Sequence, residues 1–142
     1  MDSTVSHEGT TIPIRVLIAD DNPLVTEILA HHLTRLGWES IAVSDGEQVE
    51  MLLAKEHFDC LILDLHIPFR NGMEILEALK KNGNRHDLFI MMLTGQCRED
   101  TQGRAIALGA DRFFSKPFDP YEIVGELQRS LSPIHQAQGR RS

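Results

Sequence analysis

The chain has 142 residues, which is enough for one domain with a hydrophobic core and too few for two domains of ordinary size. Its 14 Lys and Arg against 21 Asp and Glu give a formal net charge of −7 without a basic stripe, which excludes strong direct binding of nucleic acid, because phosphate neutralisation supplies most of that affinity. No apolar run approaches the ~20 residues that span a bilayer, the N-terminus lacks a signal peptide's apolar core, and the two cysteines form no Cys-x-x-Cys pattern, so we expect a cytoplasmic protein without membrane contact.

Five short apolar runs are predicted to be strands. They lie at residues 16–19, 40–43, 60–63, 88–93 and 112–114. The runs are continuous rather than alternating, which is typical of strands that are buried on both faces of a sheet. Because helical periodicity follows each run, the sequence predicts an α/β fold with right-handed crossovers and a parallel sheet.

Four of the five predicted helices begin at a capping or turn residue. These starts are Asn22 before Pro23, Ser44 with Glu47, Gly72, and Asp119 before Pro120. The fourth helix, about residues 98–108, has the weakest signal, because Gly103 inside it costs about 1 kcal/mol relative to alanine. We assign residues 1–12 to an N-terminal tail, 13–132 to one domain and 133–142 to a C-terminal tail.

Polar side chains follow four of the five predicted strands, at the point where each strand ends. They are Asp20, Asp21, Asp64, Thr94 and Lys116. In a doubly wound sheet the carboxyl ends of the strands form the ligand-binding edge, so these side chains are expected to meet there. Carboxylates that crowd together repel one another, and a divalent cation removes that cost. Oxygen-only ligands suit Mg²⁺ or, failing that, Mn²⁺.

This combination of groups is suited to phosphoryl transfer, which needs little beyond positioning and charge neutralisation. Asp64 would be the nucleophile and would become an aspartyl phosphate. The metal and the Lys116 ammonium would share the charge on the phosphoryl oxygens, and the Thr94 hydroxyl would donate a hydrogen bond to one of them.

Five ordered motifs resemble the receiver domain of bacterial two-component response regulators, in particular stand-alone receivers like the chemotaxis regulator. The matching segments are residues 17–22 (LIADDN), 63–68 (LDLHIP), 71–76 (NGMEIL), 93–95 (LTG) and 109–118 (GADRFFSKPF), and the resemblance covers about residues 14–131. It implies a flavodoxin-like, doubly wound fold with five parallel strands in the order 2-1-3-4-5 and five helices on both faces of the sheet.

The resemblance also implies roles for individual residues. Asp64 would be the phosphoacceptor. Asp21 would bind the metal directly, Asp20 through water, and His66 through its backbone carbonyl. Thr94 and Lys116 would contact the phosphoryl group, and Phe113 would be an aromatic switch residue, although a plain core aromatic is the alternative. His66 and Gln96 occupy positions that tune dephosphorylation in the family, and the Lys116–Pro117 bond is expected to be cis.

The partners implied by the resemblance are a sensor histidine kinase or a histidine phosphotransfer protein as donor, and a downstream protein as target. Phosphorylation would alter the face formed by the fourth helix, fifth strand and fifth helix, in a monomer or in a dimer that forms on phosphorylation. The cognate kinase, the target and the dephosphorylation rate are not predicted. Whether the chain is a stand-alone receiver or a fragment of a larger regulator or hybrid kinase also stays open.

Three other functions are weighed against this one. A phosphatase with an aspartyl nucleophile typically needs an acid two residues after that nucleophile, where this chain has His66. We therefore do not expect a turnover enzyme, although the chain would slowly hydrolyse its own phosphoryl group. A flavodoxin-like cofactor binder needs a Gly-rich or Ser/Thr-rich phosphate loop, whereas residues 20–23 are acidic. A receiver-like interaction module that is never phosphorylated stays open, although the complete set of acidic residues argues against it.

Overall fold

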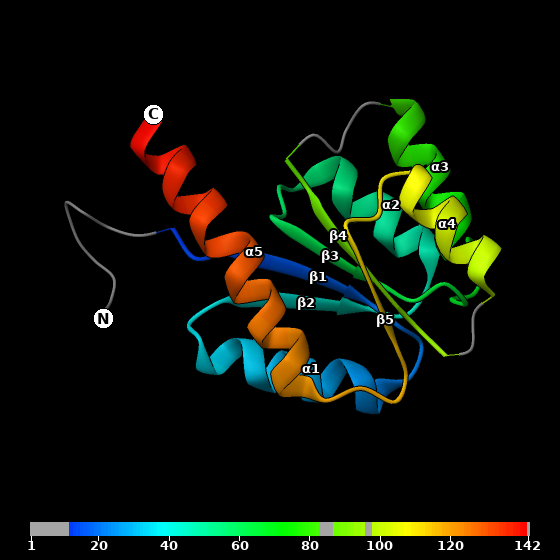
Figure 1. Cartoon of the computed structure of the whole chain (residues 1–142), viewed down its shortest axis with the longest axis horizontal. Coiled ribbons are helices and arrows are strands. Elements are labelled where there is room, and N and C mark those ends of the chain that lie inside the picture. The colour runs from blue at the N-terminus through cyan, green and yellow to red at the C-terminus, as the bar shows by residue number, and fades with distance from the viewer. Residues whose placement is uncertain (1–11, 83–86, 96–97, 142) are drawn as a thin grey trace.

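The computed structural model describes residues 12–82, 87–95 and 98–141, with side chains described up to Leu131. A single sheet has five parallel strands: β1 (Arg15–Ala19), β2 (Glu39–Val43), β3 (Cys60–Leu63), β4 (Phe89–Thr94) and β5 (Arg112–Ser115). Their order is β2-β1-β3-β4-β5, which confirms the fold class expected from the sequence (Figure 1).

Five helices alternate with the strands and cover both faces of the sheet. They are α1 (Pro23–Arg35), α2 (Gly46–Lys55), α3 (Gly72–Asn82), α4 (Glu99–Ala107) and α5 (Pro120–Arg141). In Figure 1, α1 and α5 lie on one side of the sheet, and α2, α3 and α4 lie on the other. None of the helices in the described ranges is both long enough and apolar enough to span a bilayer.

The helix ends follow local chemistry with two differences from the prediction. Asn22 caps α1 as expected, because its side chain accepts a hydrogen bond from the Leu24 amide at 3.0 Å. The cap of α2 is Asp45 rather than Ser44, with the Gln48 amide donating to its carboxylate at 2.9 Å. The last helix reaches Arg141, so most of the segment assigned to a C-terminal tail is helical.

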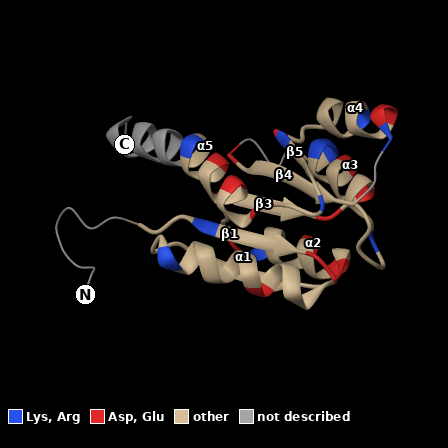
Figure 2. Cartoon of the chain, turned by 60° about the horizontal axis from the view of Figure 1, so that its bottom comes forward, with Lys and Arg blue, Asp and Glu red and all other residues tan. Residues whose placement is uncertain are grey.

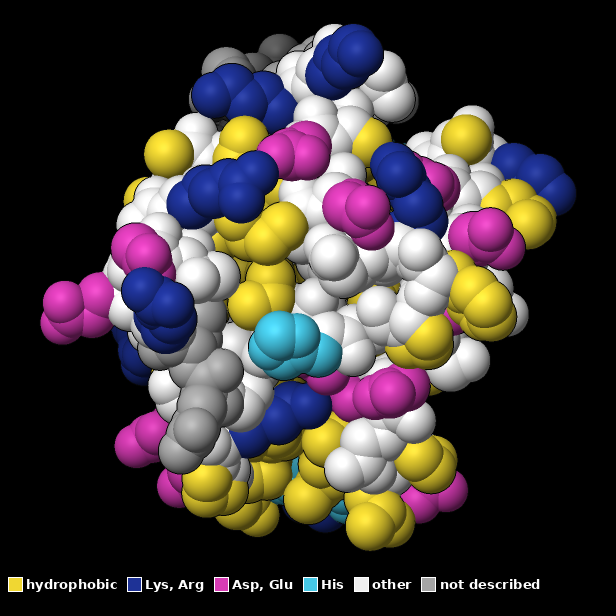
Figure 3. Space-filling model, turned by 90° about the vertical axis from the view of Figure 1, so that its right-hand side faces the viewer, with side chains coloured by type: hydrophobic (Ala, Val, Ile, Leu, Met, Phe, Trp, Pro, Cys, Tyr) yellow, Lys and Arg dark blue, Asp and Glu magenta, His cyan; other side chains and the backbone are white. Residues whose placement is uncertain are grey.

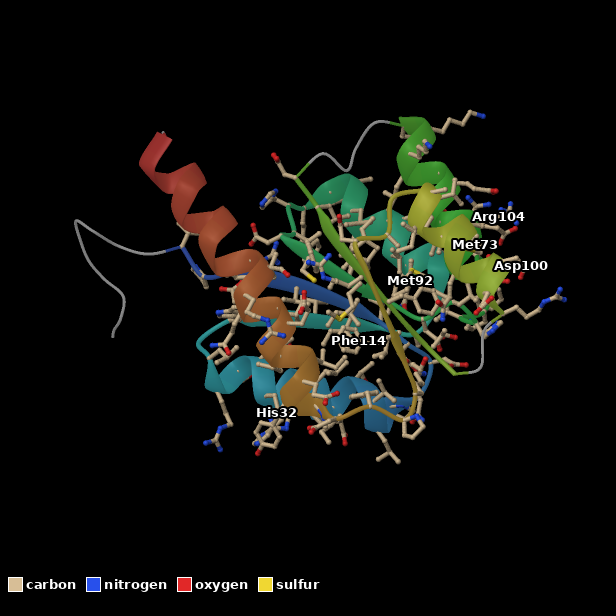
Figure 4. All side chains as sticks on the ribbon, in the orientation of Figure 1. His32, Met73, Met92, Asp100, Arg104 and Phe114 are labelled. Carbon is tan, nitrogen blue, oxygen red and sulfur yellow. The ribbon has the colours of Figure 1, made fainter. Side chains whose placement is uncertain are left out.

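Two apolar layers, one on each face of the sheet, form the core. Leu17 and Ala19 of β1 face the layer shared with α2, α3 and α4, whereas Val16 and Ile18 face the layer shared with α1 and α5. The same division holds for the side chains labelled in Figure 4, where Met92 belongs to the first layer and Phe114 packs on the second. Full burial of such a side chain stabilises the fold by roughly 1.5–3 kcal/mol. This two-sided burial fixes the strands and therefore the edge at which they end.

Candidate functional site

The carboxyl edge of the sheet is held in register by backbone hydrogen bonds that continue past the strands. The Asp20 amide donates to the Val43 carbonyl at 3.1 Å, and the Asp64 amide donates to the Ala19 carbonyl at 2.9 Å. The Lys116 amide donates to the carbonyl of Thr94 at 2.6 Å. Asp20, Asp64 and Lys116 are therefore each held by the neighbouring strand as well as by their own.

Asp20, Asp21 and Asp64 form one acidic cluster at this edge. One carboxylate oxygen of each lies within 4.8 Å of the others. Asp20 and Asp64 are buried, whereas Asp21 is exposed at the mouth of the site. Figure 2 shows acidic positions in the loops that follow the strands here. Oxygen donors at this spacing fit a hard divalent cation such as Mg²⁺, which keeps several of its own waters.

Lys116 neutralises part of this acidic cluster. Its Nζ lies 2.7 Å from Asp20 Oδ2 and 3.3 Å from Asp64 Oδ2. Burial raises the pKa of Asp20 despite the opposing hydrogen bonds from Lys116 and the Asn22 amide. Burial by itself would lower the pKa of Lys116, but its contacts with Asp20 and Asp64 outweigh that effect and raise it. The ammonium therefore stays charged between the two buried carboxylates.

Thr94 supplies a hydroxyl group that has no use in the fold itself. The residue is 0% exposed, and within the part of the chain that the structure describes its Oγ1 has no hydrogen-bond partner. A buried hydroxyl without a partner costs free energy, so its presence needs an explanation in the function. An acceptor brought to this edge, such as a phosphoryl oxygen, would supply the missing bond.

The remaining residues predicted for the site are placed as follows. His66 is exposed, and its backbone amide donates to Asp64 Oδ1 at 3.1 Å. Phe113 is half-buried and packs on the layer that contains α4. The Lys116–Pro117 bond is cis. Gln96 lies outside the described residues. The roles assigned to these residues and to the acidic cluster stay predictions at this point.

Figure 3 looks onto this edge of the molecule, where acidic, basic and histidine side chains lie near one another. A feature of the edge that sequence patterns did not indicate is the close approach of Gly72 to the backbone of Asp64. A Cβ at Gly72 would lie 2.9 Å from the backbone oxygen of Asp64. Only glycine permits this approach, because real Cβ atoms are not found so close to a carbonyl oxygen. The sequence signal was the Asn-Gly pair after the loop, which by itself indicates only a turn.

Comparison with known proteins identifies the family. The sequence model of the response regulator receiver domain family matches residues 16–128. The chain belongs to this family. The chain is 34% identical over 116 residues to the response regulator GtcR of Aneurinibacillus migulanus. This match covers 82% of this chain and 47% of that protein. The chain is 31% identical to the phosphate regulon transcriptional regulatory protein PhoB of Pseudomonas aeruginosa, over 82% of this chain and 51% of that protein. The chain thus spans about half the length of these curated relatives.

Solved structures give the same result for the receiver domain. The chemotaxis protein CheY4 of Vibrio cholerae superimposes with a TM-score of 0.77 at 28% identity, covering 84% of this chain and all of that one. A response regulator from Burkholderia pseudomallei, solved with a phosphorylated aspartic acid, a calcium ion and citrate, gives a TM-score of 0.73 at 26% identity, covering 91% of this chain and 75% of that one.

Proposed function

We propose that this receiver domain is a signalling switch in which Asp64 accepts a phosphoryl group from a phosphohistidine of a sensor kinase or phosphotransfer protein. The observation that carries the proposal is the convergence of Asp64 with Asp20, Asp21 and Lys116 at the carboxyl edge of the sheet. The unpartnered hydroxyl of Thr94 at the same edge supports it. Among the solved relatives, the protein from Burkholderia pseudomallei carries a phosphorylated aspartic acid and a cation.

In the proposed reaction a carboxylate oxygen of Asp64 attacks the phosphorus atom. The P–N bond to the donor imidazole breaks, and the imidazole leaves with the bonding electron pair. Asp21, Asp64 and the His66 carbonyl would hold Mg²⁺ directly, and Asp20 would hold it through water. The bound ion would supply charge neutralisation for the phosphoryl oxygens. Lys116 then exchanges its contact with the Asp64 carboxylate for one with the phosphoryl group, and Thr94 donates its hydroxyl.

The proposed output is a change in the face formed by α4, β5 and α5. Thr94 and Lys116 bind the phosphoryl group better in one conformation of the domain than in the other. Phosphorylation therefore shifts the equilibrium between the two conformations by this difference in interaction free energy. Phe113 follows Thr94 in this proposal, because β5 pairs with β4 and Phe113 packs on the layer beneath α4. The downstream partner is proposed to be a protein that binds this face. A cytoplasmic site of action stays a prediction, which cell fractionation would test.

The decisive experiment is incubation with Mg²⁺ and acetyl phosphate, followed by measurement of the intact mass. The proposal predicts an adduct of one phosphoryl group that is lost with EDTA treatment before labelling and in Asp64→Asn. The matched control is Asp87→Asn, because Asp87 is an exposed aspartate before β4, at the opposite edge of the sheet. An adduct that persists in Asp64→Asn would place the acceptor elsewhere. No adduct at any Mg²⁺ concentration would favour the module that works without phosphorylation, and rapid turnover of phosphate esters would favour an enzyme.

A further inference from the structure

The loop between β3 and α3 contains a strained turn close to the phosphoacceptor. Phe69 has a φ angle of +72°, a value that is unusual for a bulky residue other than glycine. The Arg70 amide donates to the Pro68 carbonyl at 2.9 Å, two residues back. This bond and the positive φ are those of a classic γ-turn, which is rare and strained. Phe69 is 76% exposed, so packing of its side chain does not offset the strain.

Helix α2 holds this turn through two residues that lie one helical turn apart. At its start, the Gly46 amide donates to the Pro68 carbonyl at 3.1 Å. A Cβ at Gly46 would lie 2.0 Å from the Arg70 carbonyl oxygen, so the helix and the turn touch backbone to backbone. One turn later, both carboxylate oxygens of Glu50 accept hydrogen bonds from the Arg70 guanidinium, at 3.3 and 2.8 Å. Such two-point pairing fixes the direction of both side chains.

The same loop carries the backbone that lies against Asp64. Its first part is anchored by the buried side chains of Leu65 and Ile67, and between them the His66 amide donates to Asp64 Oδ1 at 3.1 Å. Pro68 follows Ile67, and its carbonyl accepts the hydrogen bond from the Gly46 amide. The position of the turn therefore sets where the peptide groups around His66 lie relative to the Asp64 carboxylate.

We propose that Glu50 and Arg70 are positioning residues for the phosphorylation site. Their ion pair, called here the α2 latch, keeps the strained turn at Phe69 from relaxing and thereby holds the His66 backbone against Asp64. The proposal rests on the proposed function, because its consequence is a tighter metal and phosphoryl site. Neither residue touches the reacting atoms; they act through the loop.

The latch predicts a loss of metal affinity when Glu50 is removed. Removal of a residue that orients a metal ligand commonly lowers metal affinity by about 10–100-fold. We expect a loss of about tenfold here, at the lower end, because the latch acts through the backbone. Calorimetry would compare Mg²⁺ binding by the parent, Glu50→Ala and Glu77→Ala. Glu77 is the matched control: it is also a helical glutamate paired with an arginine, Arg104, at 2.6 Å, but it joins α3 to α4. Figure 4 labels Arg104 on α4.

A second measurement reads the latch without metal. Hydrogen exchange of the His66 amide, followed by NMR, should be faster in Glu50→Ala and unchanged in Glu77→Ala. The double variant Glu50→Ala with Phe69→Gly should recover most of the Mg²⁺ affinity and most of the slow exchange at His66. Glycine adopts a positive φ without strain, so the turn then needs no latch. A residue that only stabilised the fold would not be rescued in this way.

The outcomes separate this inference from the proposed function. Unchanged Mg²⁺ affinity and unchanged His66 exchange in Glu50→Ala would overturn the latch, as would equal losses in Glu77→Ala or no recovery on adding Phe69→Gly. A parent protein that binds no Mg²⁺ would instead refute the proposed function. In that case faster exchange at His66 in Glu50→Ala would still support the positioning role, and unchanged exchange would refute it.

Discussion

Replacement of Thr94 by valine should change the stability of the protein in opposite directions in its two states. Thr94→Val exchanges the buried, unpartnered hydroxyl for a methyl group of similar size. Burial of a hydroxyl without a hydrogen bond costs about 1–3 kcal/mol, so we expect the unphosphorylated variant to gain about 1–2 kcal/mol of unfolding free energy. At this chain length such a gain raises Tm by about 3–7 °C.

The same variant should respond less to a phosphoryl mimic. With Mg²⁺ and beryllofluoride at 100 times its Kd, the parent should gain about 2.7 kcal/mol of stability by mass action. A hydrogen bond to a charged group is worth about 1.5–3 kcal/mol, so loss of the hydroxyl should remove most of that gain at the same concentration. Urea unfolding with and without the mimic measures both quantities.

The control is Thr94→Ser, which keeps the hydroxyl and loses one methyl group. It should lose about 1 kcal/mol of stability without the mimic and keep the full response to it. The reasoning would be refuted by a Thr94→Val protein that is less stable than the parent without the mimic. It would be refuted equally by a valine variant that gains as much from beryllofluoride as the parent does.

Three further predictions concern pH and packing. Because burial raises the pKa of Asp20, calorimetry should show Mg²⁺ affinity falling on acidification at a higher pH than an ordinary aspartate would allow, with protons released on binding. Arg112, hydrogen-bonded at 2.6 Å, lowers the pKa of Glu126, so Glu126 stabilises the fold above its ordinary pKa and this contribution is lost as pH falls through the depressed value. Glu126→Gln should thus flatten the change of urea midpoint between about pH 5 and pH 3, and a curve like the parent's would contradict this. Gly46→Ala should cost about 2 kcal/mol or more in urea unfolding, because its Cβ would meet the Arg70 carbonyl oxygen at 2.0 Å, and a variant as stable as the parent would rule out that contact.

Most of the fold was predictable because its signals are local. Continuous apolar runs such as Cys60–Leu63 indicate strands buried on both faces, and a cap such as Asn22 before Pro23 indicates where a helix begins. The capping residue of α2 was wrong by one position, since Ser44 and Asp45 are both good caps and the choice depends on the path of the chain from β2. Boundaries of this kind are set by tertiary contacts that local patterns do not contain.

The candidate site was predictable for a different reason. A parallel sheet brings the carboxyl ends of its strands to one edge, so the polar residues after those strands had to meet. What the sequence did not indicate is how their loops are supported. The pairing of Glu50 with Arg70 joins residues 20 positions apart, and the γ-turn at Phe69 uses a residue type that does not favour it. Neither leaves a periodic pattern or a motif, because each depends on the packing of α2 against the loop.

The dispersal of the site over the sheet links signalling to folding. Asp20, Asp64 and Lys116 follow three different strands and Thr94 ends a fourth, and backbone hydrogen bonds to neighbouring strands hold Asp20, Asp64 and Lys116. A chain in which β5 has not yet docked lacks the ammonium beside Asp64, and one without β1 lacks two of the three carboxylates of the acidic cluster. If Asp64 is the phosphoacceptor, as proposed, its phosphorylation therefore requires the complete sheet, and partly folded chains would not be phosphorylated.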